Sequence, residues 1–399
     1  MTTPLAIDGG SPSVTRPLPE WPVHDHRERD NLLAVLESGQ WGSITGTKVE
    51  AFAAAFARFQ GAEHAVCTTS GSTALEAALE ALGVGPGDEV ITSAWTFVAT
   101  AGAILTLGAR PVFVDIDPAT NTIDPDRIEA AITPKTKAIV PVHIGGLPAD
   151  MDGVMAVAEH AGLPVLEDAC QAWGASWNGF GVGTIGDLGC FSFQESKNIT
   201  GGEGGAVVTG DRELRDRVWA IHNTGRDPER PGMFDFAMVG RNLRMTEWQA
   251  AILLAQLGRL PEQMDRRDRS AARLSAALGE IPGVTPLRVG SRVTRCAWHL
   301  YQLTYDRNAL GGRDRETLLA ALAAEGVPAS GGYLALPRVE AVRTAIRDRF
   351  GADAADQPIP HAEAAGATTV WLPQTLLLGD DALIDEVVAA FRKIATAWG

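Results

Sequence analysis

Cysteine, tyrosine and basic residues are scarce in this chain. Its 399 residues include four cysteines and three tyrosines, and 34 Lys and Arg stand against 49 Asp and Glu, which gives a formal net charge of −15. The four cysteines form no CxxC pair, and no basic run followed by an apolar stretch and a small-residue cleavage site opens the chain. We therefore expect a cytoplasmic protein that folds without disulfides.

Long apolar runs and clusters of positive charge are also missing. Gly, Pro or a charged residue interrupts every apolar stretch well short of the roughly 18 residues that a membrane helix requires. The acidic balance opposes binding to nucleic acid, because that affinity comes largely from clustered Lys and Arg. His24 and His26 have no second ligand cluster near them and are expected on the surface. We expect no membrane span, no nucleic-acid partner and no metal site.

Short β-branched runs alternate with helix-like segments between residues 64 and 210. This alternation predicts βα units around a buried, largely parallel sheet. The apolar residues of Ser72–Leu82 have helical spacing, so this helix should pack on the sheet. The seven candidate strands are His64–Thr68, Glu89–Ser93, Pro111–Asp115, Lys137–His143, Pro164–Glu167, Gly189–Phe193 and Ala206–Thr209.

The length of the chain indicates two or three folding units. We expect an N-terminal arm and first helix over residues 1–35, a large domain over 36–265 and a smaller α/β domain over 266–399. Pro4–Val23, with five prolines and two glycines, predicts an extended arm of a kind that often packs on a partner subunit. A helical pattern covers Glu247–Leu257 and resumes at Pro261.

Lys197 stands in the most informative segment of the chain. It follows a predicted strand and precedes a glycine-rich turn, Gly201-Gly-Glu-Gly-Gly205, that leads into the next strand. Aromatic residues and hydroxyls surround the lysine, and the glycines let a ligand approach the backbone. A loop lysine is usually solvated, but burial would lower its pKa and favour the neutral amine that imine formation needs.

Two further segments have features of ligand sites. Asp168 follows a predicted strand, at the carboxyl end where α/β sheets bind ligands. A pyridinium nitrogen would pair with this carboxylate, although a helix N-cap explains Asp168 equally well when it is taken alone. Thr68-Thr-Ser-Gly-Ser-Thr73 turns a strand into an amphipathic helix, and the free N–H groups and hydroxyls of such a turn bind phosphate or only cap the helix.

A phosphate turn, an acid at a strand end and a buried lysine occur in the order expected of fold-type I pyridoxal-phosphate enzymes. The chain resembles the DegT/DnrJ/EryC1/StrS family of aminotransferases, which act on keto-sugars and keto-cyclitols in antibiotic and surface-polysaccharide pathways. This resemblance implies an aspartate-aminotransferase-like α/β fold with a seven-stranded, mostly parallel sheet and a smaller C-terminal α/β domain. The motifs that carry it are Gly39-Gln-Trp-Gly42, Gly146-Leu-Pro-Ala-Asp-Met-Asp152 and Gly240-Arg-Asn-Leu-Arg-Met245.

The resemblance also implies roles for single residues. Lys197 would form the Schiff base with pyridoxal 5′-phosphate and shuttle protons, and Asp168 would pair with the pyridine nitrogen. A neighbouring subunit would complete the site, so a homodimer with a shared active site is implied. Without the resemblance, Phe97 would be a core aromatic and Asn242 a turn residue. The other cofactor contacts would be Ser72, Thr73 and Ser192 at the phosphate, Gln171 at the phenolic oxygen, Phe97 on the ring and Asn242 from the neighbouring subunit.

Lysine at position 197, where some family members have histidine and dehydrate sugars, favours amino transfer. The residues around it are most similar to the branch with aminocyclitol aminotransferases and 3-amino-5-hydroxybenzoate synthases. We expect L-glutamate or L-glutamine as donor and a keto-sugar or keto-cyclitol as acceptor, in antibiotic biosynthesis. An aromatising synthase and a cofactor-binding regulatory protein without turnover are the alternatives. Acceptor contacts would fall in loops Arg226–Val239 and Gly331–Arg338, and His143 and His299 would line the site or lie in the core.

Overall fold

Seven strands form a central sheet in the computed structural model, which describes residues 4–230, 235–351 and 357–399. Two groups, β1-β9-β8-β5 and β3-β2-β4, are joined by parallel bridges between Ile139 and Val165 and between Val142 and Asp168. Only β9 runs antiparallel to its neighbours β1 and β8, while the other pairings are parallel. The predicted seven-stranded, mostly parallel sheet is confirmed.

Each predicted strand is present, with its ends shifted by up to three residues. The largest shift is at β4, which ends at Val140 instead of at His143, although pairing with β5 continues to Val142. The strands of this sheet are β1 (His64–Thr68), β2 (Glu89–Ser93), β3 (Arg110–Val114), β4 (Thr136–Val140), β5 (Leu166–Asp168), β8 (Leu188–Ser192) and β9 (Gly205–Thr209).

Helices cover this sheet and keep its apolar side chains from water. Leu75, Ala78 and Leu79 of α3 pack with Val66 and Val207 of the sheet, as their spacing predicts. No helix in the described part of the chain is both long and apolar enough to cross a membrane. The helices up to this point in the chain are α1 (His26–Ser38), α2 (Lys48–Gln60), α3 (Gly71–Ala81), α4 (Val98–Thr106), α5 (Met151–Ala161) and α6 (Arg212–His222).

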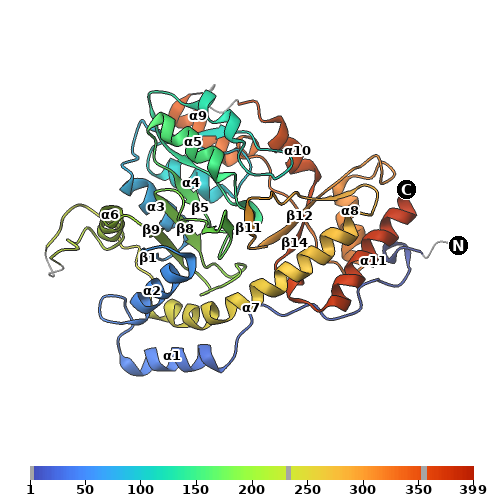
Figure 1. Cartoon of the computed structure of the whole chain (residues 1–399), viewed down its shortest axis with the longest axis horizontal. Coiled ribbons are helices and arrows are strands. Elements are labelled where there is room, and N and C mark those ends of the chain that lie inside the picture. The colour runs from blue at the N-terminus through green and yellow to red at the C-terminus, as the bar shows by residue number, and fades with distance from the viewer. Residues whose placement is uncertain (1–3, 231–234, 352–356) are drawn as a thin grey trace.

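Helix α7 (Glu247–Leu278), the long yellow helix of Figure 1, has side chains in two hydrophobic cores. It continues through Pro261, where the sequence pattern was interrupted, and this proline lies on the exposed face. Water can therefore bond the carbonyl oxygen that proline leaves without a donor. Side chains up to Met264 belong to the core beside the sheet, and those from Ala271 onward belong to the second core. The predicted domain boundary between residues 265 and 266 falls inside this helix.

The second core lies under an antiparallel sheet with the order β10-β12-β14-β13. Leu5 and Val14 of the N-terminal arm join this core, so this part of the arm packs on its own chain. A third, small sheet consists of β6 (Ser176–Trp177), β7 (Phe180–Gly181) and β11 (Val293–Arg295). The remaining elements are β10 (Val284–Pro286), β12 (Leu300–Tyr305), α8 (Arg315–Ala324), β13 (Ser330–Gly331), α9 (Glu340–Phe350), α10 (Pro360–Thr368), β14 (Thr369–Pro373) and α11 (Asp381–Trp398).

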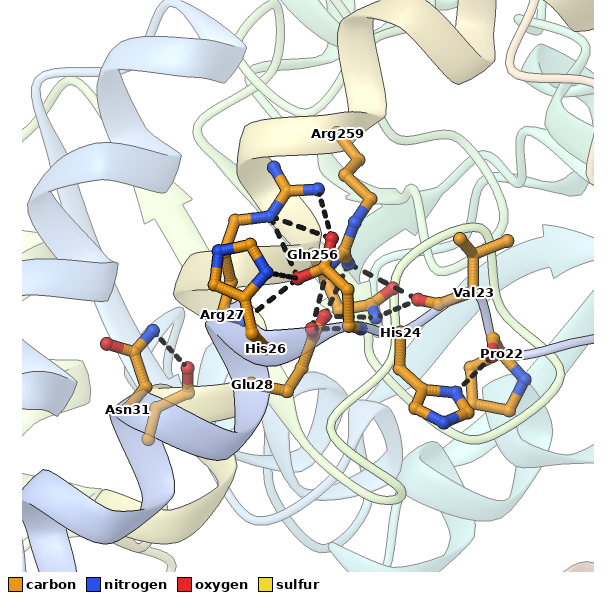
Figure 2. A network of polar contacts seen from close by, with 11 residues as sticks. Pro22, Val23, His24, His26, Arg27, Glu28, Asn31, Gln256 and Arg259 are labelled. Atoms are coloured by element: carbon orange, nitrogen blue, oxygen red, sulfur yellow. Dashed lines mark hydrogen bonds and ion pairs between the residues drawn. The ribbon is translucent and has the colours of Figure 1, made fainter.

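A buried ion-pair network ties α1 to α7 (Figure 2). Arg259 of α7 donates to both carboxylate oxygens of Glu28, with 2.6 Å between Nη2 and Oε2, and Gln256 donates to Glu28 Oε1 at 2.9 Å. Arg259 also lies 3.0 Å from the carboxylate of Asp25, the N-cap of α1. Burial acts to raise the pKa of Glu28, but the bonds from Arg259 and from the Asp25 backbone outweigh it and lower this pKa to about 2.

A Glu28→Gln variant should lower the free energy of unfolding by about 1 to 3 kcal/mol at pH 7, because it weakens a charge-assisted bond inside the protein. The pKa of Glu28 is depressed in the folded state, so its contribution is complete above the ordinary glutamate pKa near 4.3 and fades as pH falls towards 2. Urea unfolding of both proteins at pH 7 and pH 3 measures this. Glu37→Gln, at an exposed site of the same helix, is the control. Equal losses at both pH values would contradict the prediction.

Candidate active site

A cavity of about 730 Å³ opens where the carboxyl end of β5 and the first turns of α3 and α4 meet β12, β14 and the N-terminal arm. Residues from both the central sheet and the antiparallel sheet therefore line one space. Six of the eight residues predicted from the sequence line it, and Thr73 and Asn242 do not; the six are Ser72, Phe97, Asp168, Gln171, Ser192 and Lys197.

Lys197 enters this cavity from the loop between β8 and β9. Its backbone N–H donates to the carbonyl oxygen of Gln194 at 3.0 Å, and Gly202 and Gly204 turn the chain with φ of 81° and 151°. Burial lowers the pKa of the Lys197 amine, although Cys170 and Asp168 act in the opposite direction. The amine is therefore deprotonated more easily than that of a solvated lysine, which suits a nucleophile.

Asp168 ends β5 with its side chain 5% exposed and both carboxylate oxygens bonded. Thr100 Oγ1 donates to Oδ2 at 2.8 Å, and the N–H of Cys170 donates to Oδ1 at 3.2 Å. No helix begins in residues 169–175, all of which are described, so the N-cap interpretation of Asp168 is wrong. Among the described residues no Lys or Arg forms an ion pair with this carboxylate. A buried carboxylate so held is suited to a cationic ring nitrogen.

A Thr100→Val variant should lower kcat/KM about tenfold, because it removes one charge-assisted hydrogen bond to Asp168 while nearly keeping the volume of the side chain. Thr100 is a positioning residue here, so Thr100→Ser, which keeps the hydroxyl, should restore most of the activity. Steady-state kinetics of both variants, with thermal unfolding to verify the fold, measures this. An inactive Thr100→Ser variant would show that the methyl group and its packing matter instead.

The N-terminus of α3 lies at one end of the cavity and has the donors that an anion would need. Gly71 and Ser72 stand in the first turn, whose N–H groups have no helical partner, and Ser192 adds its hydroxyl. A Cβ at Gly71 would lie 2.7 Å from Ser192 Cβ, so only glycine lets the helix approach β8 this closely. Thr73 is used differently: its hydroxyl donates to the Ser70 carbonyl at 2.9 Å and belongs to the helix cap.

Gln171 and Phe97 form further parts of the cavity wall with Tyr333. Gln171 accepts from the N–H of Gly145 at 2.7 Å and donates to the Tyr333 hydroxyl at 3.3 Å. Phe97, 50% exposed, lies with its ring 5.9 Å from that of Tyr333. Burial raises the pKa of Tyr333 to about 12, so its hydroxyl stays protonated at neutral pH. This aromatic wall is suited to a flat ring.

Asn242 is exposed and pairs with Asn223 through a backbone bridge outside the cavity of its own chain. The role implied for it therefore requires a second subunit and stays a prediction. Of the two loops expected to hold acceptor contacts, Gly331–Arg338 supplies Tyr333 to the cavity, and 226–239 includes residues 231–234, which lie outside the described residues.

Several cavity residues had no distinct signal in the sequence. Trp21 comes from the N-terminal arm and donates its indole N–H to the carbonyl of Glu195 at 2.8 Å. His299 lines the cavity as well, and burial together with the charges of Lys197 and Arg267 holds its pKa well below the usual range. His143 instead lies in the core, 2.9 Å from the Glu167 carboxylate. The sequence left both histidines open between site and core. Trp21 and Thr100, by contrast, had no local signal, because each meets its partner across a long stretch of chain.

The order of Lys197, Asp168 and the α3 turn around one cavity matches a known family. Residues 22–392 match the DegT/DnrJ/EryC1/StrS aminotransferase family. The chain belongs to this family. It is therefore a pyridoxal-phosphate-dependent aminotransferase, and the predicted family, enzyme class and cofactor are confirmed.

Individual relatives are similar over nearly their whole length. A putative L-glutamine:3-amino-2,3-dideoxy-scyllo-inosose aminotransferase of Streptoalloteichus tenebrarius is 40% identical and covers 99% of this chain and 98% of its own. An L-glutamine:2-deoxy-scyllo-inosose aminotransferase of Micromonospora echinospora is 39% identical and covers 98% of both chains. The crystal structure of a 3-amino-5-hydroxybenzoic acid synthase superposes with a TM-score of 0.86 at 37% identity, over 96% of this chain and 98% of that one. The aspartate-aminotransferase-like fold is thus confirmed.

Proposed function

We propose that this enzyme transfers the amino group of L-glutamine to a keto-cyclitol of the 2-deoxy-scyllo-inosose type. The observation that carries the proposal is the near full-length similarity, at 39% to 40% identity, to two aminotransferases named for this donor and these acceptors. A cavity of about 730 Å³ with aromatic walls and a few polar groups has the volume for a cofactor together with one small hydroxylated ring.

The residues of this cavity fit pyridoxal 5′-phosphate. The first turn of α3 with Ser72 and Ser192 would hold the phosphate, Asp168 the ring nitrogen and Phe97 one face of the ring. Bound there, the cofactor would act as an electron sink that stabilises negative charge at the Cα of the substrate. The close approach that Gly71 permits and the Asp168 carboxylate, which has no ion-pair partner among the described residues, support the fit.

Lys197 would carry the proton in both halves of the reaction. We propose that its Nζ would hold the cofactor at rest and would take the proton from the Cα of the amino donor. The lowered pKa of Lys197 keeps this nitrogen available as a base near neutral pH. Thr100 and the Cys170 N–H orient Asp168 throughout, because both of its oxygens stay bonded.

A second copy of the chain would complete the site. We propose a homodimer in which Asn242 of each subunit reaches the phosphate end of the other cavity. Its exposure outside its own cavity supports this arrangement. The four cysteines are free, which fits the reducing cytoplasm that we propose as its location.

Amination of defined ketones tests the proposed function. The purified enzyme, loaded with cofactor and given L-glutamine, should aminate 2-deoxy-scyllo-inosose or its 3-amino derivative, with the product identified by mass spectrometry. L-glutamate in place of L-glutamine tests the donor, and a nucleotide-linked keto-sugar tests the sugar branch. Aromatisation of an amino-shikimate-type compound without amination of either cyclitol would favour the synthase alternative, which the structural neighbour supports. No reaction with any donor would favour a regulatory protein.

A further inference from the structure

Arg267 of α7 is a fully buried arginine without an acidic partner. Its side chain is 0% exposed, and no carboxylate in the described part of the chain bonds or ion-pairs with it. The Trp21 ring lies 5.8 Å from its guanidinium carbon, and its Nη1 has no hydrogen-bond partner. Burial lowers the pKa of Arg267 to about 9, so it keeps its charge at neutral pH. A positive charge without an ion-pair partner in the described part of the chain, although Asp268 is near enough to act on its pKa, therefore lies behind the wall of the active-site cavity.

Gln374 stands between this charge and the cavity. It follows the end of β14, lines the cavity, is 2% exposed, and its backbone N–H donates to the His299 carbonyl at 3.1 Å. Arg267 donates to Gln374 Oε1 from both Nε, at 3.1 Å, and Nη2. A guanidinium is only a donor, so the amide oxygen must face Arg267 and the NH₂ group must face away from it. That NH₂ group is buried and has no partner.

We propose that the Gln374 side-chain NH₂ binds the α-carboxylate of the amino donor, and that Arg267 acts as a positioning residue that orients and polarises this amide. The proposal deepens the proposed function, on which it rests, by assigning a donor-binding group in the cavity. A buried polar nitrogen without a partner is destabilising, so its presence in a cavity wall indicates a group that a ligand satisfies.

The positive charge behind Gln374 selects a carboxylate over a hydroxyl. A hydrogen bond from a cation to Oε1 draws electron density from the amide and makes its N–H groups stronger donors. The same charge attracts an anion through the poorly screened interior. L-Glutamine has one carboxylate, whereas neither proposed keto-cyclitol acceptor carries a negative charge. Gln374 should therefore act on the donor half of the reaction and have little effect on the acceptor half.

A Gln374→Glu variant separates this role from a structural one. Glutamate has the same length and can still accept both Arg267 bonds, so the fold should be kept, but the NH₂ donor is lost and the positive charge is neutralised. With L-glutamine, the visible absorption band should disappear more slowly in single-turnover experiments. The kcat/KM of this donor half-reaction should fall at least about tenfold, mainly because KM rises. The acceptor half, started from the aminated cofactor, should change by less than about threefold.

Binding of an unreactive donor analogue gives a second measurement. Glutaramate, which is L-glutamine without its amino group, should bind the wild-type holoenzyme at least about tenfold more tightly than Gln374→Glu in a calorimetric titration. Glutaramide, which lacks the carboxylate, should not distinguish them. Asn308→Asp adds the same charge at an exposed position outside the cavity, and should behave as wild type.

The outcomes distinguish the two proposals. Equal glutaramate binding by wild type and Gln374→Glu, or a defect confined to the acceptor half, would overturn the role of Gln374 while leaving the aminotransferase reaction intact. A wild-type protein that binds glutaramate through Gln374 but aminates no cyclitol would overturn the proposed acceptor alone. Loss of the folded state in Gln374→Glu would itself contradict the proposal, because the Arg267 contact is expected to survive.

Discussion

A Lys197→Ala variant should lose more than about 10,000-fold of the aminotransferase kcat, and with it the visible absorption band of the lysine-bound cofactor. The loss is this large because one group is expected to serve as nucleophile and as general acid and base, and positioned proton transfer alone contributes up to about 10,000-fold. Stopped-flow spectroscopy and steady-state amination with L-glutamine measure both effects.

Lys135→Ala, at an exposed lysine, is the matched control and should retain the band and the activity. Lys197→Ala should unfold at nearly the wild-type temperature, because the amine forms no ion pair in the described part of the chain. A visible band that persists without Lys197 would show that the cofactor is linked elsewhere, and the assignment of this lysine would be wrong.

An Asp168→Asn variant should lower kcat roughly 100-fold to 1,000-fold, the range found when one preorganised electrostatic partner of a reacting group is removed. Asparagine keeps the shape and an oxygen for the Thr100 hydroxyl, but it lacks the charge that would hold a proton on the ring nitrogen. Cofactor binding should weaken less than catalysis, since the α3 turn and Lys197 are unchanged.

Kinetics and cofactor titration of Asp168→Asn measure these two effects separately. A variant with full activity would mean that the negative charge is unnecessary and that Asp168 acts only through its hydrogen bonds. A variant that binds no cofactor but folds would instead place Asp168 among the groups that dominate affinity.

The central sheet could be predicted because the sequence pattern of each of its strands and helices is local. Each buried strand is a short run of β-branched residues, and each helix between strands repeats its apolar residues within a few turns, as in Leu75, Ala78 and Leu79 of α3. The ends of the strands were less predictable. At β4 the pairing with β2 ends at Val140, whereas the pairing with β5 continues to Val142.

The cavity residues that follow strands of the central sheet could also be predicted from the sequence. Lys197, Asp168 and the Ser70–Ser72 turn follow strands of one sheet, and topology brings the ends of such strands together. Thr73 shows the limit of this reasoning, because a hydroxyl one residue further along the same turn bonds within the helix cap and not towards the cavity.

Order and spacing along the chain were enough to predict the fold class, the family and the lysine and acid at the strand ends. The groups that surround these residues depend on tertiary packing. Thr100 meets Asp168 across 68 residues, and Arg267 meets Gln374 across 107. Such contacts depend on how α4 packs on the sheet and how α7 crosses between two cores, and no local pattern encodes the meeting of groups that far apart.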